Sequence, residues 1–319
     1  MGLHITLRQL SVFEAVARNL SYTRAAEQLH LSQPAVSMQV RQLEESVGLP
    51  LFEKLGKKIH LTEAGREMFH YSQNISRQLS EAEEVIEGLK GVTRGHLRIS
   101  VATAANHFAT RVLAAFTRAY PGTSFSLDVT NRKTLLKHLS DNEADLVIMG
   151  QPPQGLEITS DIFMDNPLVV IASPDHSLFE EFKSCRVPLS RIREETFVVR
   201  EQGSGTRIAM ERYFKQQGIN LQAGMEMTSN EAIKHAVEAG MGLGIVSIHT
   251  IELELETGRL DVLEVEEFPI MRHWYMVQGK GKRLPPVAQA FKEFLHSKEA
   301  EHLLKSPVRH PIAEAVRIL

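Results

Sequence analysis

The chain of 319 residues is long enough for two or three compact units, and its formal net charge of −3 shows no global basic excess. A single cysteine, Cys185, excludes an intramolecular disulfide, and no apolar run approaches the length of a membrane span. Because the N-terminus also lacks a basic-then-apolar export pattern, we expect a cytoplasmic protein with no membrane partner.

The first sixty residues predict a cluster of helices. Thr6 and Gln9 form a capping-box pattern at the start of a first helix. Two further helices follow, joined by a tight turn at His30 and Leu31, and Ser32 is a natural N-cap for the second of them. The apolar stripe of this last helix consists of Val36, Val40, Leu43 and Val47.

The outward face of that helix is unusual because small, uncharged side chains dominate it. A DNA major groove would explain this, since Gln and Arg can read base edges and small apolar groups can meet thymine methyls. The alternative interpretation is that this segment is an ordinary helical hairpin that does not contact DNA. The residues predicted to contact DNA are Ser32, Gln33, Pro34, Ala35, Ser37, Met38 and Arg41.

Two short apolar runs in residues 48–65 flank a turn at Gly56-Lys57-Lys58. Together with Lys54, these lysines would hold backbone phosphates beside the reading helix, although a plain solvated turn also explains Lys57 and Lys58. Residues 1–62 carry seven Lys and Arg against five Glu, a net +2, so DNA affinity must come from local placement and from doubling in a dimer. We interpret residues 1–62 as a winged helix-turn-helix DNA-binding domain.

Residues 63–90 predict a long linker helix with an apolar seam of about three and a half heptads, in which Ser72 is a weak member. This regularity favours pairing of two chains over packing on the chain's own domain. Gly88, Gly91 and Gly95 then indicate a hinge. The predicted dimerisation residues are Met68, Ile75, Leu79, Ala82, Ile86 and Leu89.

Beyond the hinge, residues 91–319 alternate short apolar strands with helices, the signature of βαβ units with mostly parallel sheets. One set of strands is expected at 97–101, 125–129 and 146–149, and a second set at 168–171, 197–199, 225–227 and 244–246. Helices are expected near 106–119, 132–140, 205–217 and 229–239. The two sets predict two α/β lobes, lobe I at about 95–163 and 267–296 and lobe II at about 164–266.

Ligands of such sheets bind beyond the carboxyl ends of the strands, often at helix N-termini, which favour anions. Arg132 and Arg207 could each clamp a phosphate or carboxylate with a bidentate fork. Helix capping is an alternative role for Thr103, Ser204 and Ser229. The predicted effector-binding residues are Ala102, Thr103, Ala104, Asn131, Arg132, Thr134, Gly203, Ser204, Gly205, Thr206, Arg207, Ser229 and Asn230.

Motifs for metal binding and catalysis are missing from the sequence. The fourteen histidines include no His-Glu-x-x-His pattern and no close His/Cys cluster, and the glycines at 203 and 205 do not match the Walker spacing. Gln202-Gly-Ser-Gly-Thr206 is not a Gly-x-Ser-x-Gly nucleophile elbow. We therefore expect no catalytic residue, no metal and no cofactor other than a small-molecule effector.

Four segments in residues 5–66 resemble the LysR-type transcriptional regulators: Leu7-Arg-Gln-Leu-Ser-Val-Phe, Ser32-Gln-Pro-Ala-Val-Ser, Leu51-Phe-Glu-Lys and Leu61-Thr-Glu-Ala-Gly65. The similarity extends to about His296. Within that family the chain is most similar to regulators of carbon dioxide fixation (Calvin-cycle, Rubisco) operons. That similarity rests on Asn131-Arg132, Asp145-Leu-Val-Ile-Met-Gly-Gln-Pro-Pro153 and Asp165-Asn-Pro-Leu-Val-Val-Ile171.

The resemblance implies a winged helix-turn-helix, a dimerisation helix and a two-lobed α/β effector domain like the periplasmic binding proteins. It also implies operator DNA and RNA polymerase as partners, a homodimer that assembles into a homotetramer, and an activator role. The effector would be a small anion, either a phosphorylated metabolite of carbon fixation or NADPH. Alternatives are a regulator of another metabolic operon with a carboxylate effector, and a metabolic enzyme that carries a DNA-binding module.

Overall fold

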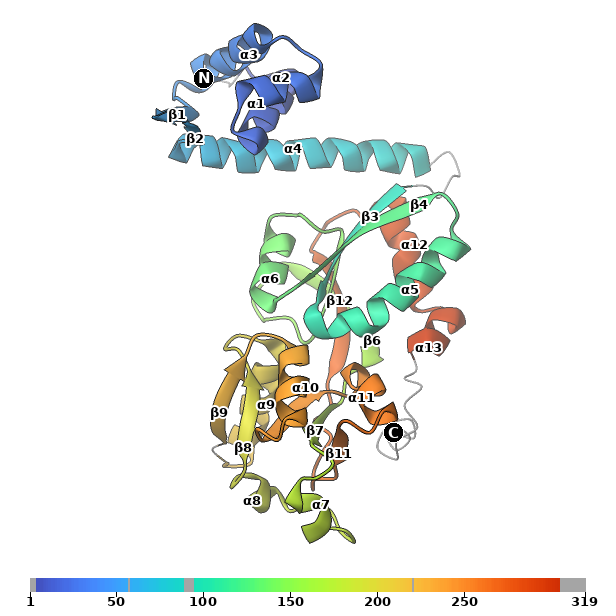
Figure 1. The fold of residues 1–319 in the computed structure, drawn as a ribbon. Helices are drawn as coiled ribbons and strands as arrows, with labels where there is room; N and C mark the ends of the chain where they lie inside the picture. The colour runs from blue at the N-terminus through green and yellow to red at the C-terminus, as the bar shows by residue number, and fades with distance from the viewer. Residues whose placement is uncertain (1–3, 57, 89–94, 220, 305–319) are drawn as a thin grey trace. The chain divides into compact units, whose positions relative to one another are not determined.

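The computed structural model describes residues 4–56, 58–88, 95–219 and 221–304 (Figure 1). The chain divides into two compact units, residues 1–90 and 91–319. Each unit has its own core. None of the helices in the described residues combines the length and the apolar character needed to cross a bilayer.

The first unit is a three-helix cluster followed by a hairpin and a long helix. The predicted capping box is present, because Thr6 Oγ1 accepts from Gln9 N at 3.2 Å and Gln9 Oε1 accepts from Thr6 N at 2.8 Å. The elements are α1 (Leu7–Asn19), α2 (Tyr22–Leu29), α3 (Gln33–Val47), β1 (Phe52–Leu55), β2 (Lys58–Leu61) and α4 (Glu63–Gly88).

The start of α4 packs against its own domain. Met68 is partly buried against the cluster that contains Phe13, and Ser72 is fully buried. The buried carboxylate of Glu14 on α1 accepts hydrogen bonds from Ser72 and Ser76, each at 2.8 Å. The alternative interpretation of the seam was packing on the chain's own domain. It accounts for Met68 and Ser72.

The other seam positions that the structure describes are exposed. The exposed fractions of Ile75, Leu79 and Ile86 are 39%, 42% and 57%, and Ala82 is exposed as well. Leu89 and residues 89–94 of the predicted hinge lie outside the described residues. The second half of α4 therefore presents an apolar stripe, as pairing of two chains requires.

Lobe I of the second unit contains a five-stranded sheet in the order β4-β3-β5-β12-β6. Helices α5, α12 and α13 cover one face, and α6 covers the other (Figure 1). The elements are β3 (Gly95–Ala102), η1 (Thr103–Ala105), α5 (Asn106–Ala119), β4 (Thr123–Thr130), α6 (Arg132–Ser140), β5 (Leu146–Met149), β6 (Ile158–Asp165), β12 (His273–Gly279), α12 (Pro286–Leu295) and α13 (Lys298–Leu304).

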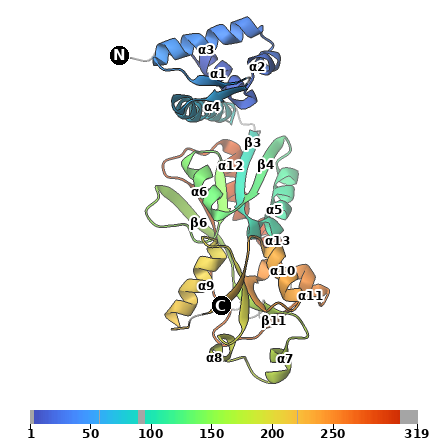
Figure 2. The ribbon, with the colours of Figure 1, turned by 60° about the vertical axis from the view of Figure 1, so that its left-hand side comes forward.

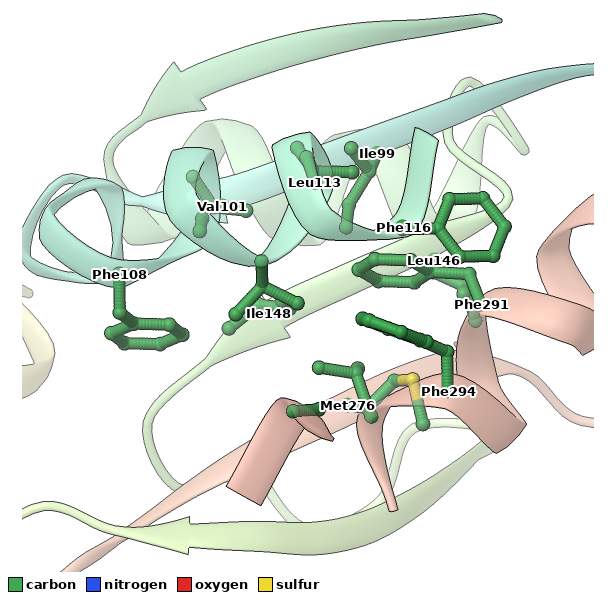
Figure 3. Packing of buried hydrophobic residues seen from close by; sticks show 14 of the residues in the cluster. Ile99, Val101, Phe108, Leu113, Phe116, Leu146, Ile148, Met276, Phe291 and Phe294 are labelled. Carbon is green, nitrogen blue, oxygen red and sulfur yellow. The ribbon is translucent and has the colours of Figure 1, made fainter. Parts of the chain in front are cut away.

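The larger core of lobe I interleaves apolar strand residues with aromatic rings (Figure 3). Phe116 of α5 meets Phe291 and Phe294 of α12 at ring-centroid distances of 5.2 and 5.6 Å. Ala300 and Leu304 of α13 are buried in the same cluster, so lobe I extends beyond its predicted end at residue 296.

Lobe II contains a second five-stranded sheet, in the order β11-β7-β10-β8-β9. Helices α9 and α10 lie on opposite faces of this sheet (Figure 2). The elements are β7 (Leu168–Ala172), α7 (Ser177–Glu181), α8 (Leu189–Ile192), β8 (Thr196–Arg200), α9 (Gly205–Gln216), β9 (Gln222–Met227), α10 (Asn230–Glu238), β10 (Leu243–Ser247), η2 (Ile248–Thr250), α11 (Glu252–Glu256) and β11 (Asp261–Leu263).

The expectation of mostly parallel sheets is wrong. Parallel pairing joins β3 to β4 and β5, and β8 to β9 and β10, whereas β6, β7, β11 and β12 pair antiparallel. The chain passes from lobe I to lobe II after β6 and returns before β12, which adds strands of the opposite direction to each sheet. No strand was predicted from the sequence at the positions of β6 and β12.

The two connections between the lobes pair with each other. Asn166 N donates to Arg272 O at 2.7 Å, and Leu168 and Ile270 exchange two hydrogen bonds of 3.0 Å. This short antiparallel crossover holds Asn166 and Arg272 beside the carboxyl ends of the strands of both sheets.

Candidate functional site

Helix α3 presents the predicted DNA-reading face. Gln33, Pro34, Ser37, Met38 and Arg41 are exposed, and Ala35 is partly buried. Ser32 caps the helix, since its Oγ accepts from Ala35 N at 3.4 Å. The Arg41 guanidinium pairs with the exposed Glu45 carboxylate at 3.1 Å, and a base edge could replace this weak surface pair.

The hairpin β1–β2 has the geometry of a wing. Lys54 and Lys58 are exposed on its two strands. Lys58 pairs with Leu55 as the first residue of β2 and does not lie in the turn where the sequence analysis placed it. Lys57 lies outside the described residues.

A pocket in the second unit lies between the two lobes. The carboxyl ends of five strands line it, at Ala102, Thr130, Met149, Arg200 and Ser247, together with the N-terminus of α9 and the crossover. Eight of the predicted effector-binding residues belong to the lining: Ala102, Thr103, Ala104, Asn131, Arg132, Ser204, Gly205 and Thr206.

Five predicted effector-binding residues do not line this pocket: Thr134, Gly203, Arg207, Ser229 and Asn230. Arg207 forms an ion pair with Glu211 one turn along α9 and donates to the carbonyl of Arg200 at 3.4 Å. The structure therefore engages the Arg207 guanidinium outside the lining of this pocket, and its role as a clamp for a cleft anion stays a prediction. Gly203 occupies a left-handed turn with φ of 83°, just before the helix.

The other three of these residues make hydrogen bonds within the chain. Ser229 Oγ caps α10 by accepting from Ala232 N at 3.1 Å, as the capping alternative proposed. Thr134 N donates to Asn131 Oδ1 at 3.0 Å, and Asn230 Oδ1 accepts from Arg200 at 2.9 Å. Ser204, by contrast, makes no capping hydrogen bond and is buried in the pocket wall.

Ten lining residues were missed by the sequence analysis: Thr130, Leu135, Met149, Gly150, Asn166, Arg200, Glu201, Ser247, Arg272 and Trp274. Asn166 and Arg272 matter most because they come from the crossover, which follows neither helical nor strand periodicity. The sequence does carry one signal for Arg272: it is a basic residue three positions after Pro269, in the connection that returns from lobe II to lobe I.

Two guanidinium groups converge on the N-terminus of α9. A Cβ atom built on Gly205 would lie 3.5 Å from Arg272 Nη2 and 3.9 Å from Arg132 Nη1. The first N–H groups of a helix have no partners within it and carry its positive dipole end. Arg132 from lobe I, Gly205 from lobe II and Arg272 from the crossover therefore enclose one strongly cationic space.

The positive charge in this space is not neutralised. Among the described residues, no carboxylate lies within ion-pair distance of Arg132, Arg272 or the nearby Arg212. Burial lowers the pKa of Arg132. Burial, reinforced by the charges of Arg132 and Arg212, lowers the pKa of Arg272 to about 10. Arginine side chains are positively charged at neutral pH, so this space is suited to an anion.

Three polar atoms of the lining are buried without a hydrogen-bond partner: Asn166 Oδ1, Ser247 Oγ and Trp274 Nε1. Buried polar groups are nearly always hydrogen-bonded, and an unpaired one costs about 1–3 kcal/mol. Trp274 also packs in the core of lobe I, 5.5 Å from the ring of Phe108. These atoms indicate that a polar ligand or ordered water occupies the pocket in solution.

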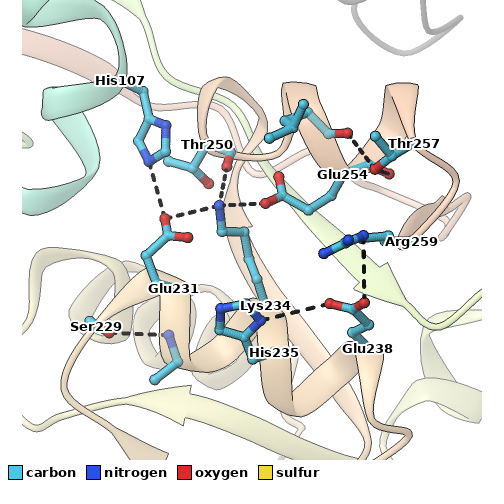
Figure 4. A network of polar contacts seen from close by, with 12 residues as sticks. His107, Ser229, Glu231, Lys234, His235, Glu238, Thr250, Glu254, Thr257 and Arg259 are labelled. Carbon is cyan, nitrogen blue, oxygen red and sulfur yellow. Dashed lines mark hydrogen bonds and ion pairs between the residues drawn. The ribbon is translucent and has the colours of Figure 1, made fainter.

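Two more deeply buried cations of this unit, Arg200 and Lys234, are paired, which sets the cleft arginines apart. Arg200 is 5% exposed and donates to Glu201 at 2.7 and 2.9 Å. Lys234 is 4% exposed and lies 2.9 and 2.8 Å from the carboxylates of Glu231 and Glu254 (Figure 4). Arg200 also reaches Thr103 across the cleft at 3.4 Å, which links lobe II to lobe I.

No group of three or more His, Cys, Asp and Glu side chains in the described residues is arranged to hold a metal ion. The polar residues of the cleft include a single carboxylate, Glu201, and it is engaged by Arg200. The site is therefore suited to binding an anion through charge-assisted hydrogen bonds.

A DNA-reading helix with a wing in one unit and an anion-binding cleft in the other define a ligand-responsive transcriptional regulator. The family model "Bacterial regulatory helix-turn-helix protein, lysR family" matches residues 7–66, and "LysR substrate binding domain" matches residues 90–300. The chain belongs to the LysR family of bacterial transcriptional regulators.

Individual relatives agree with this assignment. A RuBisCO operon transcriptional regulator of Allochromatium vinosum is 60% identical over 298 residues, which span 93% of this chain and 98% of the relative. The CcmR regulatory domain of Synechocystis PCC6803, solved in complex with 2-PG, is 39% identical with a TM-score of 0.60, covering 64% of this chain and 96% of that one. Full-length CbnR bound to its target DNA shares the fold, with 20% identity, a TM-score of 0.67 and coverage of 91% and 99%.

We predict that Arg41→Ala reduces affinity for the cognate operator by about 1–3 kcal/mol and relaxes discrimination against random DNA, since it removes a base contact. Lys58→Ala is the matched control. It should weaken cognate and random duplexes alike and lower the slope of binding against salt by about one. Electrophoretic mobility or anisotropy titrations measure both. An unchanged ratio of cognate to random affinity in Arg41→Ala would show that Arg41 does not read bases.

We predict that Arg272→Met raises the melting temperature of the ligand-free protein and abolishes its stabilisation by anions. Methionine fills a similar volume without a desolvated charge beside two other cations. Each kcal/mol gained corresponds to about 2–4 °C in a domain of this size. Scanning calorimetry measures the change, and Arg193→Met, at an exposed site outside the cleft, is the control. A melting temperature below that of the wild type would contradict the prediction.

Proposed function

We propose that this regulator controls genes of carbon dioxide fixation and that a small phosphorylated anion in the inter-lobe cleft sets its activity. The observation that carries the proposal is the pair Arg132 and Arg272, which face the N-terminus of α9 without a carboxylate partner. The 60% identical relative is named for the RuBisCO operon, and the 39% identical regulatory domain was solved with 2-PG. No resident cofactor is needed, and activation would proceed through contact with RNA polymerase.

The ligand would favour closure of the two lobes. Arg132 belongs to lobe I and the α9 N-terminus to lobe II, so an anion bound by both is held best when the lobes approach. A ligand shifts an equilibrium only by its differential affinity for the two states.

We expect 2-phosphoglycolate to bind the full-length protein and Arg132→Ala to weaken binding about 10- to 100-fold, the usual effect of a lost charge-assisted hydrogen bond. Arg207→Ala is the matched control: it removes an arginine from α9 that lies outside the cleft lining, and it should leave affinity nearly unchanged. Isothermal titration calorimetry measures both, with glycolate and NADPH as comparison ligands.

The phosphate-effector proposal fails if 2-phosphoglycolate does not bind, or if glycolate binds equally well. A carboxylate effector would then be favoured. Footprinting and in vitro transcription on the promoter of the organism's own Rubisco genes, with and without the ligand, test the proposed target. An absence of protection there would overturn the carbon-fixation assignment while the family assignment stands.

We further propose that α4 pairs two chains and that dimers assemble into tetramers. The exposed stripe of Ile75, Leu79, Ala82 and Ile86 supports the first step. Ile75→Glu would bury an unpaired charge in the paired seam, at a cost of several kcal/mol. We predict dissociation and loss of tight operator binding, measured by sedimentation and DNA titration. Ser80→Glu, at an exposed position off the seam, should change neither; unaltered assembly of Ile75→Glu would contradict the pairing.

A further inference from the structure

A buried carboxylate joins the DNA-binding cluster to the long helix α4. Glu14 of α1 is 8% exposed, and its Oε1 accepts hydrogen bonds of 2.8 Å from the hydroxyls of Ser72 and Ser76 on α4. Its Oε2 pairs with Arg18, one turn along α1, at 3.3 Å. Both oxygens of this carboxylate therefore have partners. We call Glu14, Ser72 and Ser76 the joint.

The hydrogen bonds of the joint fix the position of α4 in a way that apolar packing cannot. Burial of Met68 beside Phe13 draws the two helices together, but the hydrophobic effect is non-directional. Hydrogen bonds are directional, and two serines one turn apart meet a single oxygen at only one register and one rotation of α4. Any other arrangement would leave a buried carboxylate without its donors.

A second anchor lies at the start of α4. Thr62 Oγ1 donates to the carbonyl of Pro50 at 2.7 Å and accepts from Gly65 N at 3.0 Å. A Cβ atom on Gly65 would collide with the carbonyl of Leu51, so the helix begins directly against the chain that leads into the hairpin. The helix axis rises about 10 Å from Gly65 to Ser72, and two fixed points at this separation define its direction.

The direction of α4 matters because the same helix carries the stripe that we propose pairs two chains. It is one uninterrupted helix (Figure 1), so the joint and the exposed stripe from Ile75 to Ile86 lie on one rod. Ile86 is about 21 Å along the axis from Ser72, and a change of about 10° at the joint would displace it by about 4 Å. That displacement is comparable to the separation of successive base pairs, about 3.4 Å.

We infer that Glu14 is a positioning residue for DNA recognition, which fixes the direction of α4 and thereby selects the separation of the two operator half-sites. In a dimer, two reading helices must enter major grooves one helical turn, or a multiple of it, apart. A rigid joint makes binding of the second half-site intramolecular only at the matching separation, whereas a loose joint accepts many separations with less gain at each. This inference rests on the proposed pairing through α4 and adds the residue that sets the geometry of the pair.

The test uses the full-length protein and duplexes with two inverted copies of one half-site, selected by the wild-type protein from random-sequence DNA. The separation of the copies is varied one base pair at a time over a full turn, about 10 base pairs. For the wild type we expect a sharp optimum, with affinity about 100-fold lower half a turn away. Glu14→Ala should lower the peak and reduce this contrast to less than about tenfold, while affinity for a duplex with one half-site stays unchanged.

Three further variants separate positioning from a loss of stability. Glu14→Gln keeps an oxygen that can accept from both serines and should keep the optimum. Ser76→Ala removes one donor at the exposed edge of the joint and should reduce the contrast by less than Glu14→Ala does. Val16→Ala opens a cavity in the core between α1, α2 and α3, so it should lower the melting temperature without changing the optimum.

A wild-type contrast in Glu14→Ala or, if that variant does not fold, in Ser76→Ala would overturn the inference. A Val16→Ala variant that loses the contrast as Glu14→Ala does would overturn it too, and so would equal losses of affinity for one and for two half-sites in Glu14→Ala, because both results indicate a role in stability alone. Wild-type protein that sediments as a dimer or tetramer but shows no preferred separation would refute the positioning role and leave the pairing intact. Sedimentation as a monomer would refute the pairing, and the inference would fail with it.

Discussion

The effector domain depends on the crossover in which residues 166–168 and 270–272 pair between the two lobes. This pairing holds Arg272 beside Arg132 and against the N-terminus of α9, where both positive charges lack a carboxylate partner. A Cβ atom on Gly150 would lie 2.3 Å from Arg272 Nη2, so the lack of a side chain at the end of β5 is a condition for this arrangement. The backbone of the crossover thus places the charge between the two sheets.

Two buried positive charges elsewhere in the unit have carboxylate partners, so the lack of such partners sets the cleft arginines apart. Lys234 and Arg200 are more deeply buried than Arg272, yet each is compensated by carboxylates. A buried charge that has lost its partner destabilises a fold by several kcal/mol, and a ligand that binds only the folded form returns stability in proportion to the logarithm of its concentration. If the proposed anion binds here, the half-buried arginines of the cleft would gain a partner and couple the two lobes.

The sequence predicted the elements that follow regular periodicity. Helices α5, α6, α9 and α10 and the strands β3, β4, β5, β7, β8, β9 and β10 lie close to their predicted positions, because their apolar residues repeat with the helical or strand period. The same approach failed at the crossover, since Asn166 and Arg272 belong to short connections whose conformation is set by tertiary pairing. It also could not reveal the ion pair of Arg207, because a strand-to-helix position does not show that Glu211, one turn later, takes the guanidinium. At Met68 and Ser72 a heptad pattern could not distinguish a partner chain from the chain's own α1.

The unpaired atoms of the cleft restrict the ligand beyond its charge. The indole Nε1 of Trp274 can only donate a hydrogen bond, so an acceptor on the ligand or an ordered water would pair with it, in addition to the oxygens that meet Arg132 and Arg272. Ser247 Oγ can donate or accept, whereas the buried amide oxygen of Asn166 needs a donor. A bare phosphate dianion offers acceptors alone. A hydroxyl group on the ligand, or an ordered water beside the phosphate, could supply the donor that Asn166 Oδ1 lacks.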